Sequence, residues 1–124
     1  MSINRVYLVG NVTADCKVYE KDGNVSCITF TVAVDDWRKN KETGESENVP
    51  GYFRCAVFGN RAAALRNSII KGVRLAIDGR LRYTTYTKGE EKRSDVSIVC
   101  EGIEFMSAKK QPKQDEQEPI PFDM

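Results

Sequence analysis

Residues 52–82 read YFRCAVFGNRAAALRNSIIKGVRLAIDGRLR and combine a strand-like segment, a short helical segment and a second strand-like segment. The first segment has a period of two, which sends alternate side chains to opposite faces of a strand. One face is apolar and the other mixes aromatic rings with an arginine. The apolar face carries Phe53, Cys55 and Val57, and the mixed face carries Tyr52, Arg54, Ala56 and Phe58.

The helical segment follows Gly59-Asn60. Asn60 is a suitable N-cap, so we expect a helix from Arg61 to about Ile70, with Gly72 as its stop. The apolar stripe of this helix is Ala62, Leu65 and Ile69. The next strand has Val73, Leu75, Ile77 and Leu81 on its core face. Its other face carries Arg74, Ala76, Asp78, Arg80 and Arg82, followed in the same parity by Thr84, Tyr86 and Lys88.

Three further strand-like segments flank this unit, and they cover residues 5–12, 25–37 and 94–106. Residues 22–24, Asp-Gly-Asn, predict a hairpin turn before the second of these segments. Alternation along that segment places Trp37 on its polar face. The charged residues 38–49 are expected to form a long mobile loop. A shift of apolar parity predicts a β-bulge around Glu101-Gly102.

Five strands with one short helix between the third and the fourth are typical of the OB-fold, a partly open Greek-key barrel. An antiparallel sandwich also fits the strand count, but the position of the helix favours the OB-fold. We therefore expect an all-β domain with one short helix over residues 1–108.

The composition changes abruptly after this domain. Residues 109–118, KKQPKQDEQE, lack the apolar side chains that a core needs, so residues 109–124 are predicted to form a disordered tail. The tail ends in a short apolar patch in acidic surroundings, Pro119, Ile120, Pro121, Phe122 and Asp123, which has no role in folding.

The composition also excludes several classes of function. The 124 residues include no histidine, and the four cysteines form no C-x-x-C pair, so we expect reduced packing thiols and no metal or cofactor. No phosphate-binding glycine motif and no nucleophile with a neighbouring base is present, which argues against an enzyme. No apolar run is long enough to span a membrane and no signal peptide is evident, so we expect a cytoplasmic protein.

The net charge of +1 does not by itself suggest a polyanion as ligand. The local arrangement of residues does indicate a polyanion, because exposed aromatic rings alternate with basic groups on one inferred face. Single-stranded nucleic acid stacks its bases on such rings while basic side chains follow the phosphates. The candidate stacking residues are Trp37, Tyr52, Phe58 and Tyr86, and the candidate phosphate contacts are Arg38, Arg54, Lys71, Arg80 and Arg82. The alternative is that these rings fill a second apolar layer or a subunit interface.

Several segments also resemble bacterial single-stranded DNA-binding proteins. The similar stretches are NRVYLVGNV at 4–12, ITFTVAV at 28–34 ending at Trp37, RCAVFG at 54–59, and IDGRLR at 77–82 after Lys71-Gly72. The likeness covers roughly residues 3–106 in the expected order. It implies a homotetramer of OB domains with DNA wrapped around the outside and stacking roles for the four aromatic residues named above.

The resemblance also implies that the tail docks on replication and repair proteins. In this family the tail ends in Ile-Pro-Phe with phenylalanine last, whereas here Asp123 and Met124 follow Phe122. The expected function is binding and protection of single-stranded DNA, with little sequence preference, in replication, recombination and repair. Two alternatives stay open: a primosomal type of OB adaptor whose main ligands are proteins, and an RNA-binding protein.

Overall fold

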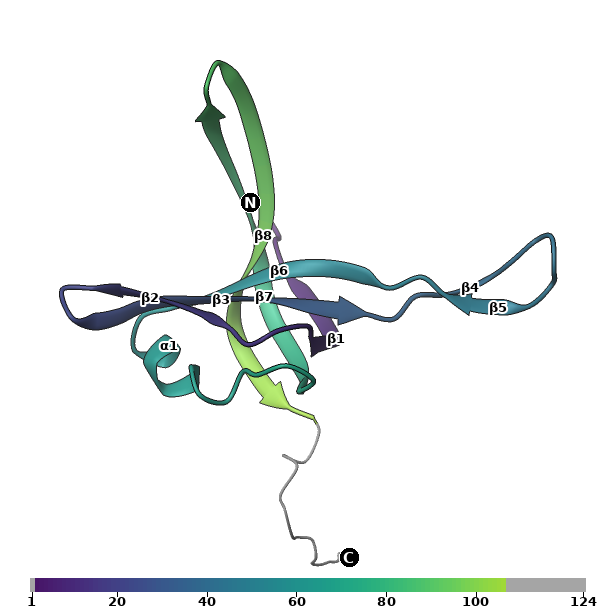
Figure 1. The fold of residues 1–124 in the computed structure, drawn as a ribbon, viewed down its shortest axis with the longest axis horizontal. Coiled ribbons are helices and arrows are strands. Elements are labelled where there is room, and N and C mark those ends of the chain that lie inside the picture. Colours follow the sequence, from purple (N-terminus) through teal and green to yellow (C-terminus); the bar gives the residue numbers. More distant parts are fainter. Residues whose placement is uncertain (1, 107–124) are drawn as a thin grey trace, which may run out of the picture.

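The computed structural model describes residues 2–106 of the chain. The elements, in chain order, are β1 (Val6–Val12), β2 (Lys17–Lys21), β3 (Asn24–Val34), β4 (Trp37–Lys39), β5 (Ser46–Asn48), β6 (Gly51–Phe58), α1 (Asn60–Leu65), β7 (Arg74–Lys88) and β8 (Glu91–Phe105) (Figure 1). Strands dominate, and α1 is the single helix of the described residues. With six residues it is too short to cross a membrane, and residues 2–106 contain no helix that is long and apolar enough to do so.

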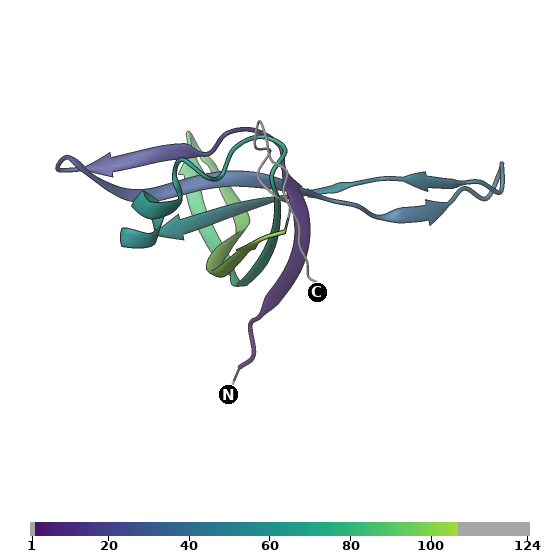
Figure 2. The ribbon, with the colours of Figure 1, turned by 90° about the horizontal axis from the view of Figure 1, so that it is seen from below.

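Five strands form the predicted OB barrel, and α1 lies between its third and fourth strands along the chain. The main sheet has the order β1-β7-β8-β6-β3-β2, and a short pairing of β1 with β3 closes it. β6 and β8 run parallel, while the other pairs are antiparallel. Figure 1 shows the hairpins β2–β3, β4–β5 and β7–β8 projecting from this barrel, and Figure 2 shows β2–β3 and β4–β5 extending to opposite sides. The all-β fold class is confirmed.

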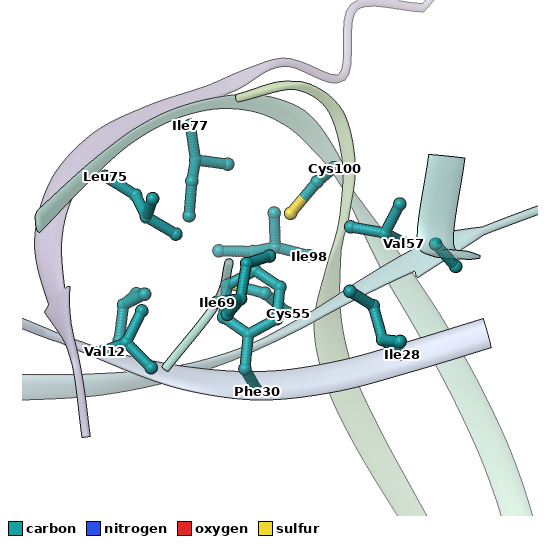
Figure 3. Close-up of a cluster of buried hydrophobic side chains, with 12 residues drawn as sticks. Val12, Ile28, Phe30, Cys55, Val57, Ile69, Leu75, Ile77, Ile98 and Cys100 are labelled. Carbon is teal, nitrogen blue, oxygen red and sulfur yellow. The ribbon is translucent and has the colours of Figure 1, made fainter. Parts of the chain in front are cut away.

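The barrel interior is filled by the apolar faces of these strands (Figure 3). Along β3 the alternation is regular, since Ile28 and Val32 have no exposed surface and Phe30 keeps 5%. The core cluster consists of Val12, Ile28, Phe30, Val32, Cys55, Val57, Ala62, Ile69, Leu75, Ile77, Ile98 and Cys100. Burial of these side chains is the main source of stability for a barrel of this size. The prediction of packing cysteines is confirmed for Cys55 and Cys100.

Two glycines permit close backbone approach where the barrel strands bend. A Cβ at Gly10 would lie 2.6 Å from the Ala33 carbonyl oxygen, and one at Gly79 would lie 2.3 Å from that of Val99. Both glycines are therefore required by sterics. The register shifts beside Gly79, where Glu101 is left without a direct partner in β7. This confirms the predicted bulge near Glu101-Gly102.

The expected loop over residues 38–49 is wrong. The predicted strand 25–37 ends at Val34, and Trp37 begins a separate hairpin, β4–β5. The turn of this hairpin is held by Asn40, whose side-chain oxygen accepts hydrogen bonds from the backbone N–H groups of Glu42 (2.8 Å) and Thr43 (3.2 Å). Such side-chain bonds to nearby backbone groups fix turns. The segment is therefore an ordered hairpin, although its charged composition is typical of a loop.

The predicted helix is also too long and its cap is wrong. α1 ends at Leu65 rather than near Ile70, and Asn60 lies inside it, since the capping position is Gly59 without a side-chain cap. Ile69 is nevertheless fully buried, because its side chain packs in the core cluster. Its carbonyl oxygen accepts a hydrogen bond from the Cys16 N–H (3.1 Å), which ties the segment after α1 to the segment before β2.

Two residues predicted to face the core are exposed instead, Leu81 at 46% and Phe53 at 42%. The reason for Leu81 is architectural. β7 and β8 continue past the barrel as a free hairpin, so the face of this hairpin that continues the barrel interior has no covering layer. Tyr83 and Val96 share this face and are exposed at 68% and 52%.

Candidate nucleic-acid interface

Strand register places a row of side chains on the solvent face of β2, β3 and β6. Tyr19 is opposite Cys27, which is opposite Phe58. Directly opposed residues in antiparallel strands project to the same face, so these three side chains lie side by side. A second row joins Lys17, Thr29 and Ala56 in the same way.

The β7–β8 hairpin continues this surface. The Arg82 guanidinium lies 5.5 Å from the centroid of the Phe58 ring, a cation–π contact between β7 and β6. Arg54 on β6 forms an ion pair with Asp95 on β8. Beyond these contacts, Tyr86 is opposite Arg93 near the end of the hairpin. We call this continuous surface the outer face, and its members include Lys17, Tyr19, Tyr52, Arg54, Phe58, Arg82, Tyr86, Arg93 and Asp95.

A groove of about 440 Å³ runs along the outer face. Its lining comes from β2, β3, β6 and β8 and includes Lys17, Tyr19, Thr31, Arg54, Phe58 and Asp95. The groove thus combines ring surfaces with hydroxyl groups and with charges of both signs. Such a mixture suits a ligand with flat apolar parts and anionic parts.

The four predicted stacking residues are all exposed. Strand parity accounts for Tyr52, Phe58 and Tyr86, whereas Trp37 is exposed because it lies on the separate β4–β5 hairpin. The exposed fractions are 66% for Trp37, 66% for Tyr52, 45% for Phe58 and 50% for Tyr86. They are spread over different elements, with Trp37 on the β4–β5 arm, Tyr52 and Phe58 at the two ends of β6, and Tyr86 on the β7–β8 arm (Figure 1). A ligand that touches all four must follow a curved path over the barrel.

Of the predicted phosphate contacts, the structure places two on the outer face. Arg54 is paired with Asp95, and Arg82 lies over the Phe58 ring. Arg38 pairs with Asp36 (2.9 Å) at the base of the β4–β5 arm, beside Trp37. Lys71 is exposed beyond α1, where its backbone N–H donates to Asp15, a residue of the groove lining.

Arg80 is the exception, because its contact is in a separate charged cluster. Its Nε donates to Glu101 (3.3 Å), which also accepts from Arg5 (2.6 Å), and Arg5 pairs with Asp78 (2.6 Å). This cluster joins the chain before β1 to β7 and β8. The structure therefore does not group Arg80 with Arg54 and Arg82.

The hydrogen bond from Arg5 lowers the pKa of Glu101 below its ordinary value of 4.5, and the same bond raises the pKa of Arg5. A carboxyl group with a lowered folded-state pKa stabilises the fold above its unfolded-state pKa, and this contribution is lost as the pH falls through the lowered value. Glu101→Gln should therefore reduce Tm at pH 7, and the difference from wild type should shrink below about pH 4.5. Thermal melts between pH 7 and pH 3 measure this, with Glu42→Gln on the β4–β5 turn as the charge control. A difference that is constant over this range would contradict the assignment.

Sequence reasoning missed Tyr19 and Asp95. The signal for Tyr19 is the alternation of Lys17 and Tyr19 directly before the predicted turn at 22–24, which marks the first arm of the hairpin. No local pattern could have found Asp95, because its ion pair with Arg54 depends on the pairing of β6 with β8.

Cys27 lies in the middle of the aromatic row and lines the groove. Partial burial raises the pKa of the Cys27 thiol, and the nearby charge of Arg82 opposes this shift. The thiol is therefore neutral at pH 7 and adds no negative charge to the groove. Within residues 2–106 no group of three or more histidine, cysteine, aspartate or glutamate side chains could hold a metal ion.

Comparisons with known proteins agree with this fold. The family model described as "Single-strand binding protein family" matches residues 3–106. "Single-stranded DNA-binding protein 1" of Staphylococcus aureus (strain COL) is 35% identical over 108 residues, which are 86% of this chain and 63% of that relative. The chain therefore spans less than two thirds of the length of this relative.

Solved structures of single-stranded DNA-binding proteins have a similar fold. A deletion mutant of the single-stranded DNA binding protein from Thermus aquaticus matches with a TM-score of 0.73 and 27% identity, over 86% of this chain and 52% of that one. The Plasmodium falciparum SSB complex with ssDNA has a TM-score of 0.75 over 86% of this chain and 97% of that one, and at 19% identity it supports the fold alone. With a family model that covers residues 3–106 and a barrel of matching topology, the chain belongs to the single-strand binding protein family.

Proposed function

We propose that this protein binds single-stranded DNA with little sequence preference and protects it during replication, recombination and repair. The observation that carries the proposal is the row of Tyr19, Cys27 and Phe58, with Arg82 over the Phe58 ring and Arg54 in the lining of the same groove. Every base offers a π-surface to such rings, so stacking is tolerant of sequence. The family's members act as binding proteins rather than enzymes.

Trp37 provides the direct test, because it is the only tryptophan of the chain and is 66% exposed. Addition of oligo(dT) at low salt should quench its fluorescence as a base stacks on the indole ring. The logarithm of the binding constant should fall with the logarithm of salt, with a slope of about −0.7 for each phosphate neutralised.

A duplex of equal length is the matched control, since its bases already stack on each other and should leave the fluorescence nearly unchanged. Unchanged fluorescence with oligo(dT), together with no complex at low salt, would rule out the proposed function. Tighter binding of a matched RNA oligomer would instead favour the RNA-binding alternative.

Assembly into a homotetramer is part of the same proposal. β1 pairs with β7 over Val6 to Asn11 but with β3 only at Asn11 and Val12, so most of one β1 edge has no partner strand among the described residues. An open edge favours pairing with a second chain. The exposed apolar side chains of Leu81, Tyr83 and Val96 also support self-association. Light scattering without DNA should give four times the mass of one chain.

We further propose that residues 109–124 form a tail that recruits replication and repair proteins, in a cytoplasmic, nucleoid-associated protein. The proposed docking residues, Pro119, Ile120, Pro121, Phe122 and Asp123, lie outside the described residues. Removal of residues 119–124 should abolish partner recruitment and leave DNA binding intact. If the same deletion abolishes the main activity, the primosomal type of adaptor is the better description.

A further inference from the structure

The four arginines predicted to contact phosphate all have partners within the protein. Arg54 pairs with Asp95, Arg38 with Asp36 and Arg80 with Glu101, while Arg82 lies over the Phe58 ring. A phosphate that approaches these arginines must therefore compete with groups already in place. This competition can affect binding only if the carboxylate lies on the path of a bound strand.

Asp95 is the carboxylate that meets this condition. It lies on β8 opposite Thr84 of β7, and it lines the groove together with Arg54 and Phe58. Its side chain is 32% exposed, compared with 60% for Arg54. Asp36 differs, because it pairs with a residue two positions away and both side chains are more than half exposed, so solvent screens that pair strongly. Glu101 belongs to the separate cluster with Arg5.

If Arg54 exchanges its carboxylate partner for a DNA phosphate, the salt dependence of DNA binding changes in a predictable way. A phosphate neutralised by Arg54 releases its counterion, which steepens the dependence of binding on salt. The carboxylate of Asp95, once free, attracts a cation from solution and cancels part of that release. If Asp95 instead keeps its contact, its negative charge repels the incoming phosphate. Both cases lower the affinity and flatten the salt dependence.

We propose that Asp95 is a specificity-determining residue of the outer face, an internal competitor of DNA phosphate for Arg54. This inference rests on the proposed function and concerns regulation of the same groove. Its consequence is that base stacking around Phe58 contributes more to binding, and the phosphate contact of Arg54 less, than the count of arginines suggests. Asp95 thereby shifts selection toward strands with accessible bases.

The test is Asp95→Asn, which removes the charge and keeps the shape. Its affinity for fluorescently labelled oligo(dT) at low salt, measured by anisotropy, should be about two- to fivefold tighter than that of wild type. The salt slope should become more negative by up to about 0.7. Glu20→Gln is the matched control, since Glu20 pairs with Arg66 (3.7 Å) after α1 and lies outside the groove lining. This control should bind as wild type does.

A double-mutant cycle assigns the effect to Arg54. In an Arg54→Gln background only the direct repulsion between Asp95 and DNA remains, so Asp95→Asn should change the affinity and the slope less than it does in the wild-type background. An effect of the same size in both backgrounds, or weaker binding by Asp95→Asn alone, would overturn the competitor role, the latter by making Asp95 a group that positions Arg54. If wild type itself does not bind oligo(dT), the proposed function fails and not merely this inference.

Discussion

Phe58→Ala is expected to weaken oligo(dT) binding by about 5- to 150-fold, which corresponds to about 1–3 kcal/mol of lost base stacking. Phe58 is 45% exposed at the end of β6, next to Cys27 and under the guanidinium of Arg82. Loss of the ring removes the stacking surface at the centre of the outer face and also releases Arg82 from its cation–π contact. Anisotropy titrations at fixed low salt measure the change.

Phe58→Tyr is the matched control, because it keeps a ring of the same shape and should bind close to wild type. The salt slope of Phe58→Ala should remain near that of wild type, since no phosphate contact is removed directly. Equal affinity of the alanine and tyrosine variants would mean that no base stacks on this ring. A large change of slope would indicate that Phe58 acts mainly by holding Arg82.

Much of the outer face was predictable because strand parity is a strict rule. The alternation in residues 52–58 already separates Tyr52, Arg54 and Phe58 from Cys55 and Val57, and the register of β3 with β6 agrees with this division. The order of strands and helix was sufficient to predict the barrel, because few topologies place a single helix between the third and fourth strands.

What could not be predicted depends on where strands leave the barrel. Parity alone assigns Leu81 to the core, but β7 extends beyond the barrel and its inner face emerges into solvent. The β4–β5 arm was hidden for a related reason, because a hairpin exposed on both faces carries no apolar alternation. Hydrophobic periodicity arises from burial of one face, so it cannot identify strands that bury few apolar side chains.

The small net charge also has a structural explanation. Arg54 and Asp95 neutralise each other across two strands, and Arg38 and Asp36 do so at the base of an arm, so the outer face carries basic groups without a strongly basic total. Under the proposed function, long-range attraction of DNA is then weak, and short-range stacking has to supply more of the binding energy. Substitutions of the exposed rings should therefore change the affinity for DNA, and substitutions in the core should change the stability of the fold.

Ile28→Ala should produce the complementary result, a loss of stability with binding by the folded protein retained. Ile28 has no exposed surface and lies on β3 between Val18 of β2 and Val57 of β6. Truncation of such a residue costs about 2–5 kcal/mol, a large share of the stability of a small domain, and should lower Tm by more than about 8 °C.

Ile28→Val is the matched control, and it should cost only about 0.5–1.5 kcal/mol because it removes one methylene group. The neighbours of Ile28 along β3, Cys27 and Thr29, point to the outer face, so that surface keeps its side chains in both variants. At a temperature where Ile28→Ala is folded, its affinity for oligo(dT) and its salt slope should equal those of wild type. Weakened binding by the folded variant would mean that the core and the outer face are coupled, whereas Phe58→Ala should lose affinity without a comparable fall in Tm.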